Sequence, residues 1–191
     1  MILFAGSLGS DLACATQTST VIMSDFYECG VADHPGPKSL YVVQRFSTGT
    51  SRIQFRLEQS AGFTGSLLSF SSAYNLAGDP SSGVSIDFAG CEAGNVQVMQ
   101  LNYMFYGTSQ NCSWISVIPG SDSPDGYIDW WDCIGTRHAG DGGGIHVDPD
   151  WGLLCPDRGG LPHNGSPFCH PYTPTVAVEA STWGSVKSLY R

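Results

Sequence analysis

Apolar residues alternate with polar ones through most of the first 133 positions of this chain. Ile53, Phe55 and Leu57, for example, are each separated by one polar or charged residue. A period of two is typical of a β-strand that buries one face and exposes the other to water. On this pattern the predicted strands are 40–46, 53–57, 65–70, 84–88, 96–106, 112–118 and 127–133.

Clusters of Gly, Pro, Ser and Asp separate these segments, at 47–49, 78–83 and 121–126. Such residues favour turn conformations. Short strands at regular spacing, with no long helical period between them, are typical of an antiparallel β-sandwich or a related jelly-roll. The predicted fold class is therefore all-β.

The chain of 191 residues suits a single domain. Residues 1–133 are predicted to form the sandwich core. Residues 134–173, rich in Gly, His and Asp, are predicted to form a long loop held by a disulfide. Residues 174–191 are predicted to add a short strand and a C-terminal tail, with Ser181 as the cap of a short helix.

Seven cysteines stand at 14, 29, 91, 112, 133, 155 and 169, and none forms a CxxC pair. That pattern, with only two lysines, favours a secreted, disulfide-bearing domain at the cell surface or outside the cell. Met1–Phe4 is too short for the apolar part of a signal peptide. We therefore expect an artificial start, or a leader that has been omitted.

The predicted strands 112–118 and 127–133 could form a hairpin. Cys112 and Cys133 would then lie at its open end, within the ~5.5 Å between Cα atoms that a disulfide requires. Local closures could join Cys14 to Cys29 and Cys155 to Cys169, leaving Cys91 unpaired. Many other pairings are equally compatible with the sequence, so the connectivity stays open.

The charge balance limits the possible partners. Lys and Arg number 8 against 17 Asp and Glu, a net charge of −9. Binding to nucleic acid or to an anionic membrane surface needs clustered cations, so we expect neither. The chain also has no apolar run long enough to span a membrane.

The segment from 134 to 173 contains candidate metal ligands. Imidazoles there could bind zinc or copper, and carboxylates among glycines could bind Ca²⁺ as a cofactor. The spacing follows no familiar metal-binding pattern, and solvated loop side chains are the simpler interpretation. The candidates are His138, Asp141, His146, Asp148 and Asp150.

Two consecutive tryptophans, Trp130 and Trp131, must point to opposite faces of a strand. If Trp131 points outward, its ring could stack on a sugar beside a polar partner; otherwise these aromatics belong to the core. The candidate carbohydrate-binding residues are Tyr127, Asp129, Trp131, Trp114 and Trp151. No G-x-S-x-G nucleophile motif occurs, and we expect a protein that is not an enzyme, with a metal-dependent enzyme as a remote alternative.

Several segments resemble a group of uncharacterised secreted bacterial proteins known from environmental genomes. The segments are Tyr41-Val42-Val43, Ile53-Gln54-Phe55, Ala61-Gly62-Phe63-Thr64-Gly65, Gly83-Val84-Ser85-Ile86, Cys91, Cys112-Ser113 and Asp132-Cys133. The ending 181–191 is similar to the Thr-Trp-Gly…Lys…Leu-Tyr-Arg tail common in that group. The strand rhythm also resembles, more weakly, cohesin-like and immunoglobulin-like sandwiches. The resemblance implies export and a surface role, and it supplies no catalytic residues.

Both ends of the chain carry apolar residues suited to assembly. Ile2 and Phe4 could add a strand to a sheet edge, and Trp183, Leu189 and Tyr190 could pack on a sandwich or act as a sorting signal. Few lysines protect the sheet edges against pairing. The predicted function is a structural or adhesive module that self-associates into oligomers or filaments. The alternatives are a carbohydrate-binding module, with polysaccharide as partner, and a metal-binding protein.

Overall fold

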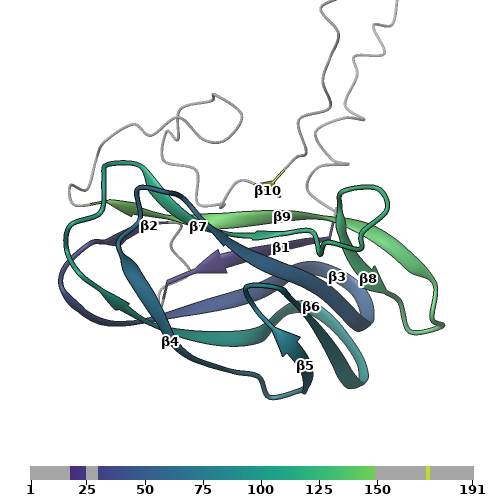
Figure 1. Ribbon diagram of the computed structural model, residues 1–191. Coiled ribbons are helices and arrows are strands. Elements are labelled where there is room, and N and C mark those ends of the chain that lie inside the picture. Colours follow the sequence, from purple (N-terminus) through teal and green to yellow (C-terminus); the bar gives the residue numbers. More distant parts are fainter. Residues whose placement is uncertain (1–17, 25–29, 149–170, 173–191) are drawn as a thin grey trace, which may run out of the picture.

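The computed structural model describes residues 18–24, 30–148 and 171–172, and within these ranges every regular element is a β-strand (Figure 1). No helix in this part of the chain could cross a membrane. The strands are β1 (Ser19–Met23), β2 (Gly30–Ala32), β3 (Gly36–Gln59), β4 (Gly65–Ser71), β5 (Asn75–Asp79), β6 (Gly83–Phe105), β7 (Ser113–Ile118), β8 (Ile128–Trp131), β9 (Arg137–Asp148) and β10 (Pro171–Tyr172). The all-β prediction is confirmed.

Two long antiparallel strands, β3 and β6, form the centre of the fold. They pair from Gly36 opposite Phe105 to Phe55 opposite Val84. β4 and β5 line the free side of β6, and β1, β8 and β7 follow one another along the other side of β3. In Figure 1, β9 runs along the upper layer, and β4, β5 and β6 lie in the lower one. β9 pairs in parallel with β1 and β2, so the sheet is mixed.

The core lies between these layers and consists of the apolar half of each alternating segment. Ile53 and Phe55 are fully buried, as are Leu101 and Ile145 from other strands. The ring of Phe63 meets Phe105 edge-on, with the ring centroids 5.2 Å apart. Each such side chain contributes about 1.5–3 kcal/mol by leaving water, so the alternation seen in the sequence is also the main source of stability.

The predicted turn at 47–49 is wrong, because β3 continues through it. The strand pairing shifts register there, with Ser47 opposite Gly94 and Thr50 opposite Glu92. The Ser47 hydroxyl lies 2.7 Å from that of Thr50, and Gly49 adopts a φ of 142° that glycine tolerates best. The turn-forming residues therefore make bulges that curve a single strand.

The predicted loop beginning at 134 is also wrong in its first part, because 137–148 form β9. Its glycines serve close packing. A Cβ on Gly142 would lie 2.3 Å from the carbonyl oxygen of Val117, and one on Gly144 would lie 2.5 Å from that of Ile115. Residues 149–170 and 173–191 lie outside the described residues, so the rest of the predicted domain division stays a prediction.

β7 and β8 do not form the hairpin that the sequence suggested. Both pair with β3 and with β9, β7 through 113–118 and β8 through 128–131. The two strands therefore lie end to end between the same neighbours. The segment 119–127, predicted in large part as a turn, leaves the sheet between them.

Candidate functional site

A row of polar and aromatic side chains crosses the outward face of the sheet. Trp131 on β8 lies directly opposite Arg137 on β9 and Arg52 on β3, and Arg52 lies opposite Asp87 on β6. Asp87 in turn lies opposite Asn75 on β5. Residues directly opposite one another in adjacent strands share one face of a sheet. We call these five residues the outer row.

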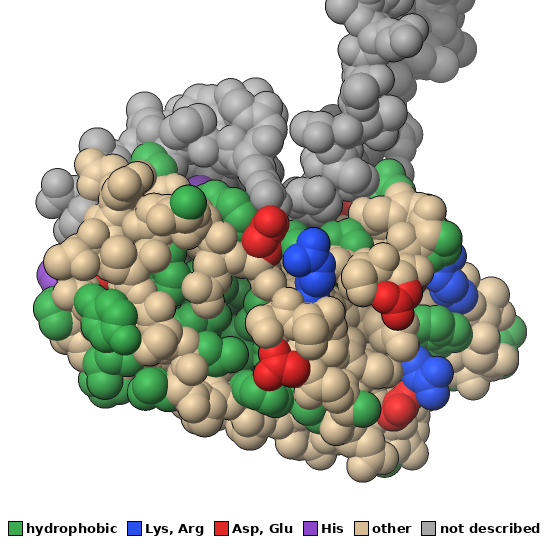
Figure 2. Space-filling view, viewed as in Figure 1, with side chains coloured by type: hydrophobic (Ala, Val, Ile, Leu, Met, Phe, Trp, Pro, Cys, Tyr) green, Lys and Arg blue, Asp and Glu red, His purple; other side chains and the backbone are tan. Residues whose placement is uncertain are grey.

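Arg52 contacts two other side chains of the outer row, those of Trp131 and Asp87. The guanidinium carbon of Arg52 lies 5.6 Å from the centroid of the Trp131 ring, and its Nε donates to the Asp87 carboxylate. About half of each charged side chain stays exposed, 47% for Arg52 and 44% for Asp87. Figure 2 shows charged side chains of both signs on the right half of this face, over β3, β6 and β8. The row therefore presents an aromatic ring and paired charges to solvent.

Arg137 anchors the other end of the row to the segment between β7 and β8. Its guanidinium pairs with the carboxylates of Asp129 and Asp125, the latter at 3.0 Å. Partial desolvation raises the pKa of Asp125. Hydrogen bonds from Arg137 and from the backbone N–H of Tyr127 outweigh it, so the pKa falls below its ordinary value. Asp125 is thus held as a carboxylate beside the row.

Trp130 confirms the prediction that the two tryptophans face opposite ways, because it is buried in the core. Its ring stacks on His138, with the centroids 4.4 Å apart. His138 Nε2 lies 2.9 Å from an oxygen of Asp132, and this hydrogen bond is the main reason that the pKa of Asp132 is lowered. Asp132 also accepts from the backbone N–H of Thr136, which closes the β8–β9 turn.

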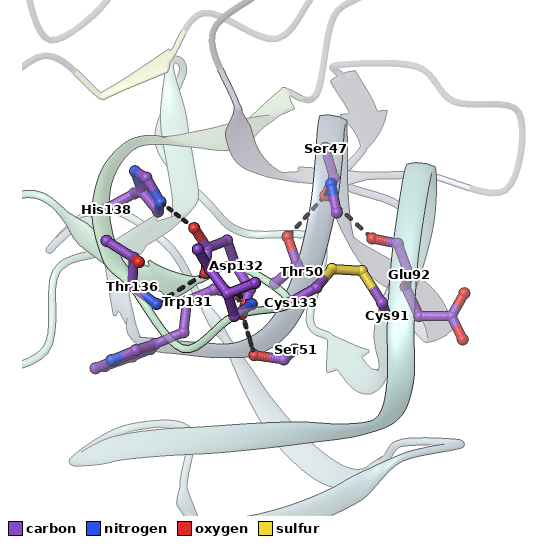
Figure 3. Close-up of a disulfide and its surroundings, with 12 residues drawn as sticks. Ser47, Thr50, Ser51, Cys91, Glu92, Trp131, Asp132, Cys133, Thr136 and His138 are labelled. Atoms are coloured by element: carbon purple, nitrogen blue, oxygen red, sulfur yellow. Dashed lines mark hydrogen bonds and ion pairs between the residues drawn. A yellow bond between two sulfur atoms is a disulfide. The ribbon is translucent and has the colours of Figure 1, made fainter.

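A disulfide between Cys91 and Cys133 ties this turn to the irregular middle of β6, with the two Cα atoms 5.4 Å apart (Figure 3). Beside it, the Ser51 hydroxyl donates to the carbonyl oxygen of Asp132 at 2.7 Å. The disulfide holds the chain after β8 against β6, and the hydrogen bond holds it against β3, which fixes the position of Trp131.

The predicted Cys112–Cys133 disulfide is wrong, and so is the prediction that Cys91 is left over. Because β7 and β8 lie end to end, Cys112 before β7 and Cys133 after β8 fall at opposite ends of the pair. Cys112 is disulfide-bonded, but its partner is neither Cys91 nor Cys133. The other predicted partners, Cys14, Cys29, Cys155 and Cys169, lie outside the described residues.

The structure spreads the predicted metal ligands along one strand. His138, Asp141, His146 and Asp148 all belong to β9, and the ten residue steps from the first to the last span about 33 Å. Burial raises the pKa of Asp141, which favours its neutral form. Asp150 lies outside the described residues. These side chains therefore have no common centre on β9 at which Ca²⁺ or another ion could bind. The metal site stays a prediction.

The predicted sugar platform is not continuous. Trp114 lies beside the end of β3, because its carbonyl oxygen accepts a hydrogen bond from the backbone N–H of Ser60. Trp131 lies opposite Arg52, further back along β3. Arg52 and Ser60 are eight residue steps apart along the chain, about 26 Å in extended strand. The Asp129 side chain is only 9% exposed and pairs with Arg137.

Among the other predicted residues, Tyr127 is half-buried. Trp151 and the assembly residues Ile2, Phe4, Trp183, Leu189 and Tyr190 lie outside the described residues. Sugar binding and assembly through the chain ends stay predictions.

The sequence did not predict Arg52, Asp87 and Arg137 as residues of a functional site. Arg52 and Asp87 both occupy polar positions of alternating segments, which predicted that they face water. Nothing in the sequence shows that β3 places one opposite the other, because register depends on the bulges at 42–52.

No protein-family model and no curated protein matches this sequence. Fourteen chains in solved structures match the fold. A non-cellulosomal cohesin from Archaeoglobus fulgidus is 11% identical with a TM-score of 0.49, over 69% of this chain and 91% of that one. A cohesin module of a Clostridium perfringens family 33 glycoside hydrolase is 8% identical with a TM-score of 0.49, over 70% and 98%.

The cohesin of a cohesin–dockerin complex from Clostridium thermocellum is 12% identical with a TM-score of 0.46, over 69% of this chain and 94% of that one. At these identities and TM-scores the similarity carries no argument about what this chain binds.

Proposed function

We propose that this chain is a non-enzymatic protein-binding module of the cell exterior, which holds proteins together rather than transforming a substrate. The observation that carries the proposal is the outer row, in which Trp131 lies between Arg52 and Arg137 on an exposed sheet face. Trp and Arg are the residue types that most often dominate the binding energy of protein–protein interfaces.

The shape of the row supports a protein as partner. Five side chains on five neighbouring strands, about 4.8 Å from one strand to the next, form a row that a protein surface can contact at several points. Arg52 already covers one face of the Trp131 ring and pairs with Asp87, so the groups are held in place before a partner arrives. Preorganised side chains lose less entropy on binding.

The disulfides support the location. Cys91 and Cys133 are both exposed and bonded to each other, and Cys112 is disulfide-bonded as well. Disulfides persist in oxidising compartments such as the cell exterior. We propose in addition that copies of the chain associate with one another through sheet edges and chain ends, as an adhesive or filament-forming module would.

The test is capture of extracellular proteins of the source organism on the immobilised full-length chain. We expect a retained protein that is lost with W131A and R52A, because truncating a dominant interface residue costs about 2 kcal/mol or more, roughly 30-fold in affinity. K38A removes a cation on β3 outside the outer row and serves as the matched control. Equal retention by W131A and the wild type would contradict the proposal.

A further inference from the structure

The free side of β6 is covered by two short strands that form one sheet edge. β4 pairs with residues 100–105 of β6, and β5 pairs with residues 83–87. Among the described strands, neither has a partner on its other side. Residues 65–79 therefore form an edge whose outward backbone N–H and C=O groups are available to a further strand. We call it the β4–β5 edge.

This edge lacks most of the features that keep sheet edges from pairing. Residues 65–78 contain no Lys, Arg, Asp, Glu or Pro, although the chain as a whole has a net charge of −9. Charged side chains and proline are the usual protection of an edge strand. The one protective feature is a bulge, between Leu67 and Ser69.

The bulge itself exposes an apolar side chain, because Leu68 is 57% exposed. Tyr106, at the end of the neighbouring β6, is 53% exposed, and its hydroxyl lies 3.0 Å from that of Ser66 on β4. Figure 2 shows apolar side chains gathered on the left half of the face, the side on which β4 lies in Figure 1. Apart from Asp79 at its end, the edge is therefore uncharged, and it carries an exposed apolar side chain at Leu68.

We propose that the β4–β5 edge pairs with the same edge of a second copy, antiparallel and around a two-fold axis near Leu68. An identical segment can face itself across a two-fold axis only when the two strands run antiparallel. Two molecules of charge −9 repel each other, and β4, which has no charged residue, lets them approach around Leu68 without opposing carboxylates. The Leu68 side chains of the two copies would then meet and leave water.

The inference deepens the proposed function, on which it rests, by naming a second copy as one partner and the β4–β5 edge, which shares only Asn75 with the outer row, as the contact. If this contact fails, binding of another protein through Trp131 is unaffected, because the capture experiment above tests that surface with different variants.

The test is the molar mass of the full-length, oxidised chain, measured by sedimentation velocity over a range of concentrations. We expect a concentration-dependent dimer for the wild type and a monomer for L68K, which places two ammonium groups at the two-fold axis. I134K is the matched control, because Ile134 is also apolar and is 88% exposed in the β8–β9 turn. It should dimerise like the wild type.

Amide hydrogen exchange of the wild type gives a second measurement that does not depend on a variant folding. Amides of 65–79 should exchange at least tenfold more slowly at a concentration that favours the dimer than at one that favours the monomer. A monomeric wild type, a dimeric L68K, a monomeric I134K, or unchanged exchange in 65–79 would each overturn the inference.

Discussion

Arg52 lies over the ring of Trp131, with its guanidinium carbon 5.6 Å from the ring centroid, and its other side pairs with Asp87. One side chain of β3 thus links β8 to β6 across the outward face. The contact between the two side chains depends on the register of β8, β3 and β6. Substituting either residue tests it directly.

The Arg52–Trp131 contact should contribute measurably to stability. Exposed cation–π contacts are worth about 0.5–1 kcal/mol. A double-mutant cycle of R52A, W131A and the double variant, followed by urea unfolding, should give a coupling free energy of that size. The same cycle with K38A in place of R52A should give no coupling. Strictly additive effects of R52A and W131A would show that the two side chains do not interact.

Removing the Cys91–Cys133 disulfide should destabilise the fold. The two cysteines are 42 residues apart, and closing such a loop in the unfolded chain corresponds to about 4 kcal/mol on the chain-entropy model. The variant C91S/C133S, compared with the wild type in urea unfolding, should show a loss of that order. Reductant should cost the wild type at least as much stability, because it also breaks the disulfide of Cys112. Unchanged stability of C91S/C133S would mean that the Cys91–Cys133 disulfide constrains little.

Asp141 should weaken folding at neutral pH. Burial raises its pKa above the ordinary value of 3.8, so the native state binds the proton more tightly than the unfolded chain. Stability from this group is complete below pH 3.8 and is lost as the pH rises through the raised pKa. D141N should therefore melt higher than the wild type at pH 7, with a difference that shrinks toward pH 3.8. A D141N chain that melts lower at pH 7 would refute this assignment.

Asp132 should act in the opposite direction. The hydrogen bond with His138 is the first cause of its lowered pKa, so the native state holds the carboxylate. Its contribution is present above pH 3.8 and is lost as the pH falls through the lowered pKa. Relative to the wild type, D132N should lower the melting temperature at pH 5 and have little effect near pH 2. An effect of equal size at both values would show that the charge of Asp132 is irrelevant.

Gly142 should resist substitution although it sits in a run of glycines. Its Cβ in G142A would lie 2.3 Å from the backbone oxygen of Val117, which cannot move without disturbing β7. Such overpacking costs typically about 1–3 kcal/mol. G90A in β6 is the matched control, since nothing lies within 4 Å of a Cβ there. Equal unfolding midpoints for both variants in urea would contradict close packing between β9 and β7.

Some of the fold follows from nearest neighbours in the chain. The alternation around Ile53 places that residue in the core and Arg52 in water whatever the topology, because successive side chains of a strand point to opposite faces. The same rule separates buried Trp130 from Trp131. The turn predicted at 78–83 also forms, with Asp79 accepting from the Ser81 backbone N–H at 2.8 Å.

Other features depended on partners distant in the chain. The glycines of β9 predicted a loop, because composition does not reveal that β7 lies close enough to exclude a Cβ at these positions. The predicted cysteine pairing was wrong for a related reason. The strands β7 and β8 are consecutive in the chain, but each pairs with β3 and β9 instead of with the other.

The sequence by itself determined an all-β chain, its buried and exposed positions, and an acidic, lysine-poor surface, because alternation and charge are properties of each residue and its immediate neighbours. Only the tertiary structure decided that Cys91 meets Cys133, that Arg52 lies between Trp131 and Asp87, and that 65–79 form an edge. Strand order and register are set by contacts between residues dozens of positions apart, and bulges such as the one at 47–50 shift them without leaving a periodic signal.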